Sequence, residues 1–347
     1  MKAIVIRQFG APEVMRLENV AEPRAAAGEI VIKVDSVSVN RTLDCAVRAG
    51  KYPVTIHMPH VLGVDPAGEV VEVGGGNSPF KIGDRVATIS IIRCGNCKQC
   101  ARGLEANCLA SQHIGLHRWG GYAEYVSVPE RNAFHIADNL SFAEGTVITR
   151  HFPMAFNLLT SKTQVRTDEW VLVMGAAGAL GSCCVQVAKM YGAKVIAGAG
   201  ADERVALALK SGADFGVNYR TQDLAKEVMA ITDGDGVDIV CENIADPTLW
   251  PGAFNSLAIG GRMVTAGAHG GGNIMLDVKR LYLRRISILG AAGTNPPDVD
   301  KALEAARSGK IRALPYRVMP LSQAVEAHHI VERNQIIGKI VLEPGND

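Results

Sequence analysis

The sequence of 347 residues lacks an excess of charge of either sign, and this absence excludes several kinds of partner. Lys and Arg number 36 against 35 Asp and Glu, which gives a net charge of +1. The sequence has no basic stripe to follow a nucleic acid backbone and no polybasic segment for an anionic membrane surface. No apolar run reaches the eighteen or so residues that a membrane span needs. We therefore expect neither nucleic acid nor membrane among its partners.

A secretory signal and a disulfide framework are also lacking. The first seven residues read as a strand and carry charge too early for a signal peptide. Four of the eight cysteines lie in one tight cluster, which favours metal binding over disulfides. Because disulfides belong to oxidising compartments, this usage of cysteine predicts a cytoplasmic protein.

The sequence does contain two patterns of secondary structure. Up to about residue 134, short apolar strands alternate with Gly, Pro and Asn turns, which is typical of a partly closed barrel. From 170 to 293, strands and helices alternate, which predicts an α/β domain with a six-stranded parallel sheet and helices on both faces. Between them, Ser141-x-x-Glu144 predicts a capping box at a helix start. The tail, with a predicted helix over 298–308 and a closing strand over 339–342, is expected to return to the first domain.

A glycine turn between a buried strand and a helix is the clearest functional motif. An apolar run over 170–174 is followed by Gly175-Ala-Ala-Gly178-Ala-Leu-Gly181, a helical pattern and a second apolar strand over 194–199. Such a βαβ unit binds a dinucleotide, because its glycines let the backbone approach the pyrophosphate at the helix N-terminus. The cofactor contacts predicted in this domain are Gly175, Ala176, Gly178, Ala179, Leu180, Gly181 and, near the end of a later strand, Asn243.

The end of the second strand of this unit indicates which dinucleotide is bound. An NAD site usually has an acid there that holds the ribose hydroxyls, whereas this chain has Gly200 between two alanines. We expect Asp202 to be the N-cap of the next helix rather than a ribose ligand. The small residues leave room for a 2′-phosphate, which Arg204 can bind bidentately and Tyr219 can reach or flank by stacking on the adenine. The sequence thus favours NADP(H); the alternative is that Arg204 is only a solvated helix charge.

Four cysteines lie within fifteen residues on a polar loop: Cys94, Cys97, Cys100 and Cys108. Four thiolates close the tetrahedron of a structural zinc ion and leave no position open for a substrate. We therefore predict one structural, non-catalytic zinc ion per chain; an iron–sulfur cluster is the rival with similar spacing.

The order of these parts resembles the medium-chain dehydrogenase/reductases, and the resemblance covers essentially the whole chain. It is carried by the glycine turn, the cysteine lobe and three further motifs, Gly83-Asp84-Arg85-Val86, GGYAEYV over 120–126 and GKIVL over 338–342. It implies a GroES-like β-barrel catalytic domain over residues 1–147 and 294–347, with a Rossmann domain over 148–293. In this family the last Rossmann strand, here 286–290, pairs with its symmetry mate, which implies a homodimer or a tetramer.

The family's alcohol dehydrogenases hold a catalytic zinc ion with an early cysteine, a histidine in a Gly-His-Glu motif and a later Cys or Asp. The first position falls here on Asn40 or Arg41, the second on Val64 and the third on Arg150. The chain is similar instead to the quinone oxidoreductases and enoyl reductases without catalytic zinc. These move hydride from NADPH to a quinone or to the β-carbon of an activated double bond. The residues at their NADPH positions are here Gly200, Arg204 and Tyr219.

Without a metal ion, hydrogen-bond donors must hold the negative charge that develops on the substrate. In the family the segments carrying Asn40, Tyr52 and Arg150 line the nicotinamide pocket, so we expect these three residues to be catalytic. The alternative for Arg150 is a structural ion pair with an acid such as Asp65.

Two rival functions stay open. One is a zinc-dependent alcohol dehydrogenase with unusual ligands, drawn from Cys45, His60 and His151. The other is a non-catalytic NADPH-binding protein.

Overall fold

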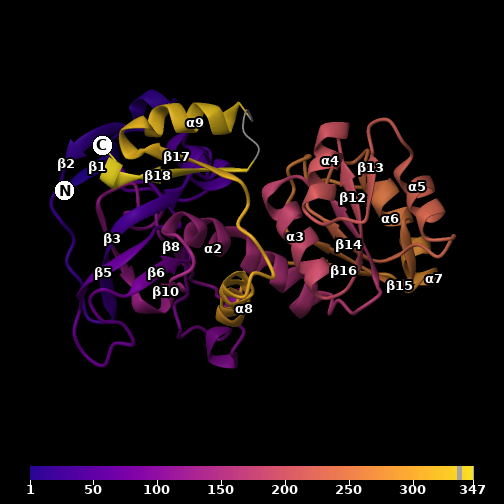
Figure 1. Cartoon of the computed structure of the whole chain (residues 1–347), viewed down its shortest axis with the longest axis horizontal. Coiled ribbons are helices and arrows are strands. Elements are labelled where there is room, and N and C mark those ends of the chain that lie inside the picture. Colours follow the sequence, from indigo (N-terminus) through magenta and orange to yellow (C-terminus); the bar gives the residue numbers. More distant parts are fainter. Residues whose placement is uncertain (334–337, 347) are drawn as a thin grey trace. The chain divides into compact units, whose positions relative to one another are not determined.

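The computed structural model describes residues 1–333 and 338–346. The chain divides into two compact units, which are Met1–Arg150 with Leu303–Asp347 and His151–Ala302 (Figure 1). The domain boundaries that the resemblance implies, between residues 147 and 148 and between residues 293 and 294, remain a prediction.

The first unit is built on antiparallel strands that the last part of the chain completes. Its larger sheet has the order β10-β6-β5-β3-β18-β17, with β9 also paired to β3, and a smaller sheet has the order β2-β1-β4. The strands of these two sheets are β1 (Lys2–Ile6), β2 (Arg16–Asn19), β3 (Glu29–Ser38), β4 (His60–Val61), β5 (Ala67–Val73), β6 (Arg85–Thr88), β9 (Tyr125–Pro129), β10 (Ala133–His135), β17 (Tyr316–Pro320) and β18 (Lys339–Glu343).

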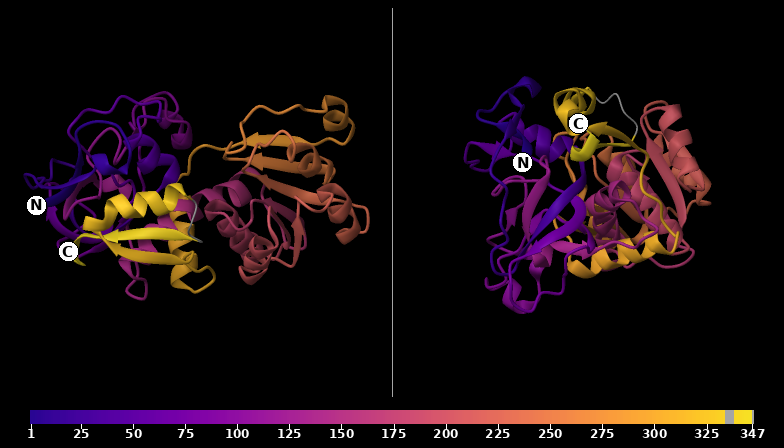
Figure 2. Two further views of the ribbon diagram at one scale, coloured as in Figure 1. Left: turned by 90° about the horizontal axis from the view of Figure 1, so that it is seen from above. Right: turned by 60° about the vertical axis from the view of Figure 1, so that its left-hand side comes forward.

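The tail joins this sheet through β18. Val341 of β18 pairs with Ser38 of β3 in antiparallel register, while β17 runs parallel to β18 on its other side. In Figure 2 the yellow C-terminal strands accordingly lie with the indigo and purple strands of the same unit. This confirms that the end of the chain returns to the first domain.

Mostly short helices connect these strands, and the longest of them, α2, continues across the boundary into the second unit. The helices are η1 (Pro12–Val14), η2 (Arg41–Cys45), α1 (Ala46–Arg48), η3 (Cys100–Arg102), η4 (Glu105–Asn107), η5 (Glu130–Asn132), α2 (Phe142–Phe156), α8 (Pro296–Arg307), η7 (Leu321–Gln323), α9 (Ala324–Glu332) and η8 (Pro344–Asn346). The predicted capping box begins α2: Glu144 N donates to Ser141 Oγ at 3.1 Å, and Ser141 N donates to Glu144 Oε2 at 2.8 Å. This prediction is confirmed.

The segment after β3 is wound as a π-helix, η2. The N–H of Cys45 donates to the carbonyl of Asn40 at 3.1 Å, five residues back. A π-turn accommodates one residue more than an α-turn and is frequent at functional sites. It brings the carboxylate of Asp44 back to the backbone N–H of Asn40, at 2.8 Å.

The second unit is the predicted six-stranded parallel sheet, in the order β13-β12-β11-β14-β15-β16. Its strands are β11 (Trp170–Met174), β12 (Lys194–Ala199), β13 (Phe215–Asn218), β14 (Val237–Glu242), β15 (Leu257–Thr265) and β16 (Ser287–Gly290). Its helices are η6 (Asn157–Lys162), α3 (Ala179–Met190), α4 (Asp202–Lys210), α5 (Leu224–Ile231), α6 (Trp250–Asn255) and α7 (Val278–Leu283). Near-continuous burial of the central strands follows from helices covering both faces. Within the described residues, no helix is long and apolar enough to cross a membrane.

One detail of the second unit differs from the sequence expectation. The N-cap of α4 is Ala201, and Asp202 is the first residue inside the helix. The prediction that Asp202 caps α4 is wrong, because its side chain is bound elsewhere, to Asn218.

Candidate functional site

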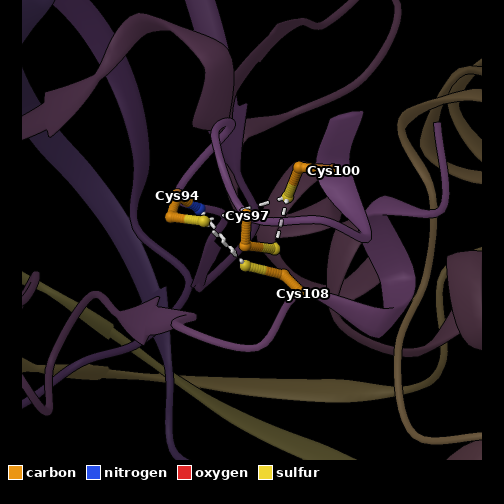
Figure 3. A group of neighbouring side chains, drawn as sticks. All are labelled: Cys94, Cys97, Cys100 and Cys108. Carbon is orange, nitrogen blue, oxygen red and sulfur yellow. Dashed lines mark hydrogen bonds between the residues drawn. The ribbon is translucent and has the colours of Figure 1, made fainter. Parts of the chain in front are cut away.

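The four predicted zinc ligands converge on one point in the loop that contains η3 and η4 (Figure 3). Their sulfur atoms all lie within 4.8 Å of one another. The Sγ–Sγ distances are 4.0 Å from Cys94 to Cys100, 3.6 Å from Cys97 to Cys100 and 3.5 Å from Cys108 to Cys94. A tetrahedron with zinc–sulfur bonds of about 2.3 Å has edges of about 3.8 Å, so the four thiols fit a single tetrahedral ion.

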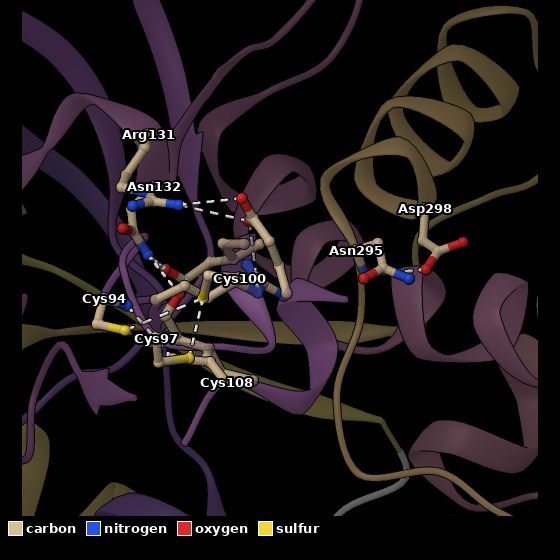
Figure 4. Close-up of polar contacts among 12 residues, drawn as sticks. Cys94, Cys97, Cys100, Cys108, Arg131, Asn132, Asn295 and Asp298 are labelled. Atoms are coloured by element: carbon tan, nitrogen blue, oxygen red, sulfur yellow. Dashed lines mark hydrogen bonds and ion pairs between the residues drawn. The ribbon is translucent and has the colours of Figure 1, made fainter. Parts of the chain in front are cut away.

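Backbone and charged groups support this lobe. The N–H of Cys94 donates to Cys108 Sγ at 3.3 Å, and backbone N–H groups lower the pKa of Cys97 to about 6, which favours the thiolate that a metal needs. The amide of Asn132 donates to the carbonyls of Ile89 and Ile91, at the base of the loop. Arg131, labelled above the cysteines in Figure 4, donates to the carboxylate of Glu105 within the loop at 3.4 Å.

The glycine turn in the second unit has the shape of a pyrophosphate cradle. Gly175 has a φ of +63°, which suits glycine, and Gly178 is the N-cap of α3. A Cβ on Gly181 would lie 2.2 Å from the carbonyl oxygen of Gly175, so this position excludes any side chain. Ala179 and Leu180 form the first turn of α3, and Ala176 lies buried at the end of β11. The local geometry therefore fits a dinucleotide phosphate at the helix N-terminus.

Asn243, directly after β14, provides a second sign of a ligand in this unit. Its side chain is 8% exposed, and neither Oδ1 nor Nδ2 has a hydrogen-bond partner among the described residues. A buried carboxamide without partners is unfavourable by about 1–3 kcal/mol. A bound cofactor with polar groups at the carboxyl ends of the strands would satisfy it.

The end of β12 carries small residues, an aromatic ring and two arginines. A Cβ on Gly200 would lie 3.1 Å from the ring of Tyr219 and 3.3 Å from Nε of Arg220. Arg204 and Arg220 are both exposed, and neither forms a salt bridge among the described residues. The structure thus adds Arg220 to the predicted pair Arg204 and Tyr219. The sequence could have indicated it, because Arg220 directly follows the Asn218-Tyr219 pair.

In the first unit, Asn40 and Arg150 are joined directly. Nε of Arg150 donates to Asn40 Oδ1 at 3.0 Å, and Asn40 Nδ2 donates to Asp65 Oδ2 at 3.0 Å. Asp65 is also held by the backbone N–H and hydroxyl of Ser38, at 2.9 and 2.6 Å. Among the described residues Arg150 forms no direct ion pair with Asp65; the two are linked through Asn40. Tyr52 packs against the apolar core of the unit and shares no hydrogen bond with this cluster in the described part of the chain.

Lys339, at the start of β18, is the residue of this cluster that the sequence analysis did not single out. Its ammonium donates to Asn40 Oδ1 at 2.7 Å and to the carbonyl of Val39 at 3.3 Å. Its position in the GKIVL motif marked the family, but nothing in the motif indicated that the lysine turns inward.

Two ionisable groups of the cluster have pKa values shifted toward neutrality. Burial and the neighbouring charge of Asp65 raise the pKa of Asp44 to about 7. Burial lowers the pKa of Lys339 to about 8. Shifts of this kind concentrate at functional sites, although structural networks produce them as well.

Two of the three candidate ligands of the rival zinc site, His60 and Cys45, are poorly suited to bind a metal ion. Nε2 of His60 is bonded to the carbonyl of Gly115 at 2.9 Å. Burial raises the pKa of Cys45 to about 12, which disfavours the thiolate. Across the described residues, the lobe of four cysteines is the one group of three or more potential ligands that could hold a metal ion.

Comparison with known proteins agrees with both halves of this architecture. The alcohol dehydrogenase GroES-like domain matches residues 26–138, and the zinc-binding dehydrogenase family matches residues 179–308. An NAD-dependent alcohol dehydrogenase of Sulfolobus acidocaldarius is 32% identical, over 99% of both chains. A quinone oxidoreductase of Sus scrofa is 29% identical, over 99% of this chain and 97% of that one.

A solved structure confirms the fold class. The crystal structure of an NAD-dependent alcohol dehydrogenase superposes with a TM-score of 0.90 at 34% identity, covering 99% of each chain. The GroES-like and Rossmann folds that the resemblance implied are thereby established. The chain belongs to the medium-chain dehydrogenase/reductase superfamily of oxidoreductases.

Proposed function

We propose that this chain is an NADPH-dependent reductase that moves hydride to a quinone or to the double bond of an α,β-unsaturated carbonyl compound, without a catalytic metal ion. The observation that carries the proposal is the cluster of Asn40, Arg150 and Lys339. The resemblance puts two zinc-ligand positions of the alcohol dehydrogenases at Arg150 and at Asn40 or Arg41, and Arg150 here donates a hydrogen bond to Asn40. Two buried or half-buried cations around one amide oxygen would repel a zinc ion.

A fixed guanidinium suits the reduction of a conjugated carbonyl. NADPH, when bound, supplies the hydride. A new C–H bond then forms at the β-carbon, the π electrons move onto the carbonyl oxygen, and a proton from water reaches the α-carbon. Arg150 is half-buried, its Nε is occupied by Asn40, and its two Nη atoms have no hydrogen bond among the described residues. Those atoms can donate to the oxygen as its negative charge grows, which stabilises the transition state more than the ground state.

The cofactor preference rests on the end of β12. A 2′-phosphate would meet the guanidinium groups of Arg204 and Arg220 and the ring of Tyr219 at a strand end where Gly200 provides the space. Charge-assisted contacts of this kind are roughly twice as strong as neutral ones. Several relatives are described as NAD-dependent alcohol dehydrogenases, so cofactor and substrate have to be compared in one experiment.

Three further features complete the proposal. The cysteine lobe holds one structural zinc ion, which would fasten the loop around η3 and η4. The chain acts in the cytoplasm. It forms a homodimer through the edge of β16, a strand that is paired on one side only, with β15.

The test is a matrix of cofactors against substrates together with the metal content. NADPH or NADH consumption is measured with 9,10-phenanthrenequinone, 3-penten-2-one and crotonyl thioester, and NADP⁺ or NAD⁺ reduction with primary and secondary alcohols. We expect NADPH consumption with a quinone or enone, no loss of rate with a chelator in excess, and one zinc ion per chain. Two zinc ions per chain, with alcohol oxidation that chelation abolishes, would support the alcohol dehydrogenase instead. Tight NADPH binding without turnover of any acceptor would support the non-catalytic protein.

A further inference from the structure

Lys339 carries a buried ammonium group that has no direct part in the proposed hydride transfer. Lys339 is 6% exposed and occupies the first position of β18, where it meets Asn40, in the segment between β3 and η2. The Nζ atom lies 2.7 Å from Asn40 Oδ1, on which Nε of Arg150 also converges, at 3.0 Å. One carboxamide oxygen therefore accepts hydrogen bonds from two cations.

The other end of the same carboxamide is equally occupied. Nδ2 of Asn40 donates to Asp65 Oδ2 at 3.0 Å and to Ser38 at 3.2 Å for the hydroxyl and 3.3 Å for the carbonyl oxygen. With cations on its oxygen and an anion on its nitrogen, the amide has one orientation only. Asn40 then has no donor left for a substrate, whereas Arg150 keeps its two Nη atoms.

We propose that Lys339 is a positioning residue of the candidate site: acting through Asn40, it fixes the guanidinium of Arg150 with its Nη atoms directed away from the amide and available to the substrate. This inference rests on the proposed function. Without Lys339, one side of Oδ1 lacks a donor, the carboxamide can rotate, and Arg150 loses the acceptor that orients it. A misplacement of catalytic groups by about 1 Å can lower a rate by about a hundredfold.

The charge of Lys339 is part of this function. The charged groups that act on it come from η2, from the segment before β5 and from α2; they are Asp65, Arg150, Asp44 and Cys45. On the neighbouring strand β17, Tyr316 is paired with Lys339 in register. On α9, His328 and Glu332 are bonded to Tyr122 and Arg48.

Burial is the main cause that lowers the pKa of Lys339, to about 8; Asp65 and Asp44 oppose this shift and Arg150 adds to it. Above that pH the ammonium loses its proton, and a neutral amine holds the amide oxygen less strongly than a cation does. Turnover should therefore fall on the alkaline side as Lys339 deprotonates.

The experiment compares Lys339→Arg and Lys339→Met with the wild-type chain between pH 6 and 10, with NADPH and 9,10-phenanthrenequinone. The wild type should lose turnover above about pH 8. Lys339→Arg keeps a charge that does not titrate in this range, so its alkaline limb should move up by at least about one pH unit. Lys339→Met should lower the turnover number by about tenfold or more at pH 7, which corresponds to one lost charge-assisted contact. NADPH affinity should stay within about twofold in both variants, since the hydrogen bonds of Lys339 go to Val39 and Asn40 and to none of the predicted cofactor contacts in the described part of the chain.

Two controls separate positioning from general damage. Lys81→Met, at an exposed lysine, should leave the pH profile unchanged. In a double-mutant cycle, the loss caused by Lys339→Met should largely disappear in the Asn40→Ala background, because Lys339 acts through Asn40. Should Lys339→Met not fold, the profile of Lys339→Arg decides alone. An unchanged alkaline limb in Lys339→Arg, or equal losses with and without Asn40, would overturn the inference.

Failure of the inference can be told from failure of the proposed function. If the wild type reduces quinones or enones but the Lys339 variants keep its profile, only the inference fails. If the wild type reduces no acceptor, the proposed function fails, and the pKa of Lys339 is then measured by NMR in the wild-type chain and in Arg150→Met. A higher pKa in Arg150→Met would show that Lys339 and Arg150 are close enough to interact. An unchanged pKa would overturn the inference as well as the proposed function.

Discussion

Asn218 Nδ2, at the end of β13, donates a hydrogen bond of 2.7 Å to Asp202 Oδ1 in the first turn of α4. The first acid after β12 is thus tied to the neighbouring strand. An NAD site uses an acid after this strand to bind the ribose hydroxyls. Because Asp202 is bound to Asn218 instead, other residues have to select the nucleotide. The arginines around Gly200 are those residues in our proposal.

Cofactor selectivity should therefore depend on these arginines. We expect Arg204→Ala to raise the Michaelis constant for NADPH by about tenfold or more, since a charge-assisted contact contributes roughly 1.5–3 kcal/mol. The constant for NADH should hardly change, because NADH has no 2′-phosphate. Arg220→Ala should act in the same direction. Lys210→Ala, at the exposed end of the same helix as Arg204, is the control. Equal weakening of NADPH and NADH would show that Arg204 is structural.

Arg150 is expected to act on turnover rather than on cofactor binding. Arg150→Met should lower the turnover number by about a hundredfold, the usual effect of removing one donor to a developing oxyanion. Fluorescence titration should show unchanged NADPH affinity. Near-normal turnover of the best acceptor would make Arg150 a structural partner of Asn40, and the donor would have to be sought elsewhere, with Tyr52 as the next candidate.

The cysteine lobe should matter for stability and not for chemistry. We expect Cys97→Ser to lower the zinc content and the midpoint of thermal unfolding, because a structural zinc ion contributes directly to folding free energy. The rate per folded molecule should stay close to that of the wild type. A collapse of the rate at a temperature where circular dichroism shows the variant fully folded would contradict a purely structural ion.

Asp44 should make the stability of the chain depend on pH near neutrality. Its pKa in the folded chain is raised to about 7, by burial first and by Asp65 second, from about 4 in the unfolded chain. The folded chain therefore binds an extra proton between these values, and the stability that this proton provides is lost as the pH rises from about 4 to about 7.

The variant Asp44→Asn has no such proton to lose. Urea unfolding at pH 5 and at pH 8 should show a larger fall in the free energy of unfolding for the wild type than for the variant. Parallel values for the two proteins would mean that Asp44 is ionised throughout this range.

The second unit should associate through β16. This edge strand is paired only with β15 in its sheet, and its own apolar side chains, Ile288 and Leu289, are half-buried in the single chain. An unpaired apolar strand edge favours pairing with a second copy. Sedimentation at micromolar concentration should show a dimer, or a tetramer built from dimers, and Leu289→Pro in β16 should shift it toward the monomer. A wild-type monomer would refute this interface.

The sequence was sufficient for the parts of the fold that depend on local pattern. Burial on both faces gives strands such as β11 and β14 their continuous apolar runs, and the reciprocal bonds of Ser141 and Glu144 follow from a spacing of three. The thiols of the cysteine lobe are close in sequence, so their convergence was predictable too. Asp202 was misassigned, because its bond to Asn218 joins two elements whose registers the sequence does not specify.

The candidate site was only partly predictable for the same reason. Asn40 and Arg150 could be placed by resemblance, but their hydrogen bond spans 110 positions of the chain. The separation of Asn40 and Lys339 is larger still, at 299 positions. The spacing from Asn40 to Asp44 is also ambiguous, because four residues suit an α-turn as well as the π-turn that the structure has. Inward-turned polar side chains carry no periodic signal of their own.

The place of β18 between β3 and β17 determines when, during synthesis, the sheet of the first domain can be completed. The ribosome emits the first 150 residues and then the whole second unit before it reaches Lys339. At roughly 5–20 residues per second, this interval lasts roughly 10–40 s. Until then the nascent first domain lacks β18, the strand that pairs with β3 and carries β17, and the ammonium that Lys339 adds to its polar cluster. The second unit is one contiguous stretch, His151–Ala302, and all of it is made before β18. If our proposal holds, a newly made chain should therefore be able to bind NADPH before it can turn over a substrate.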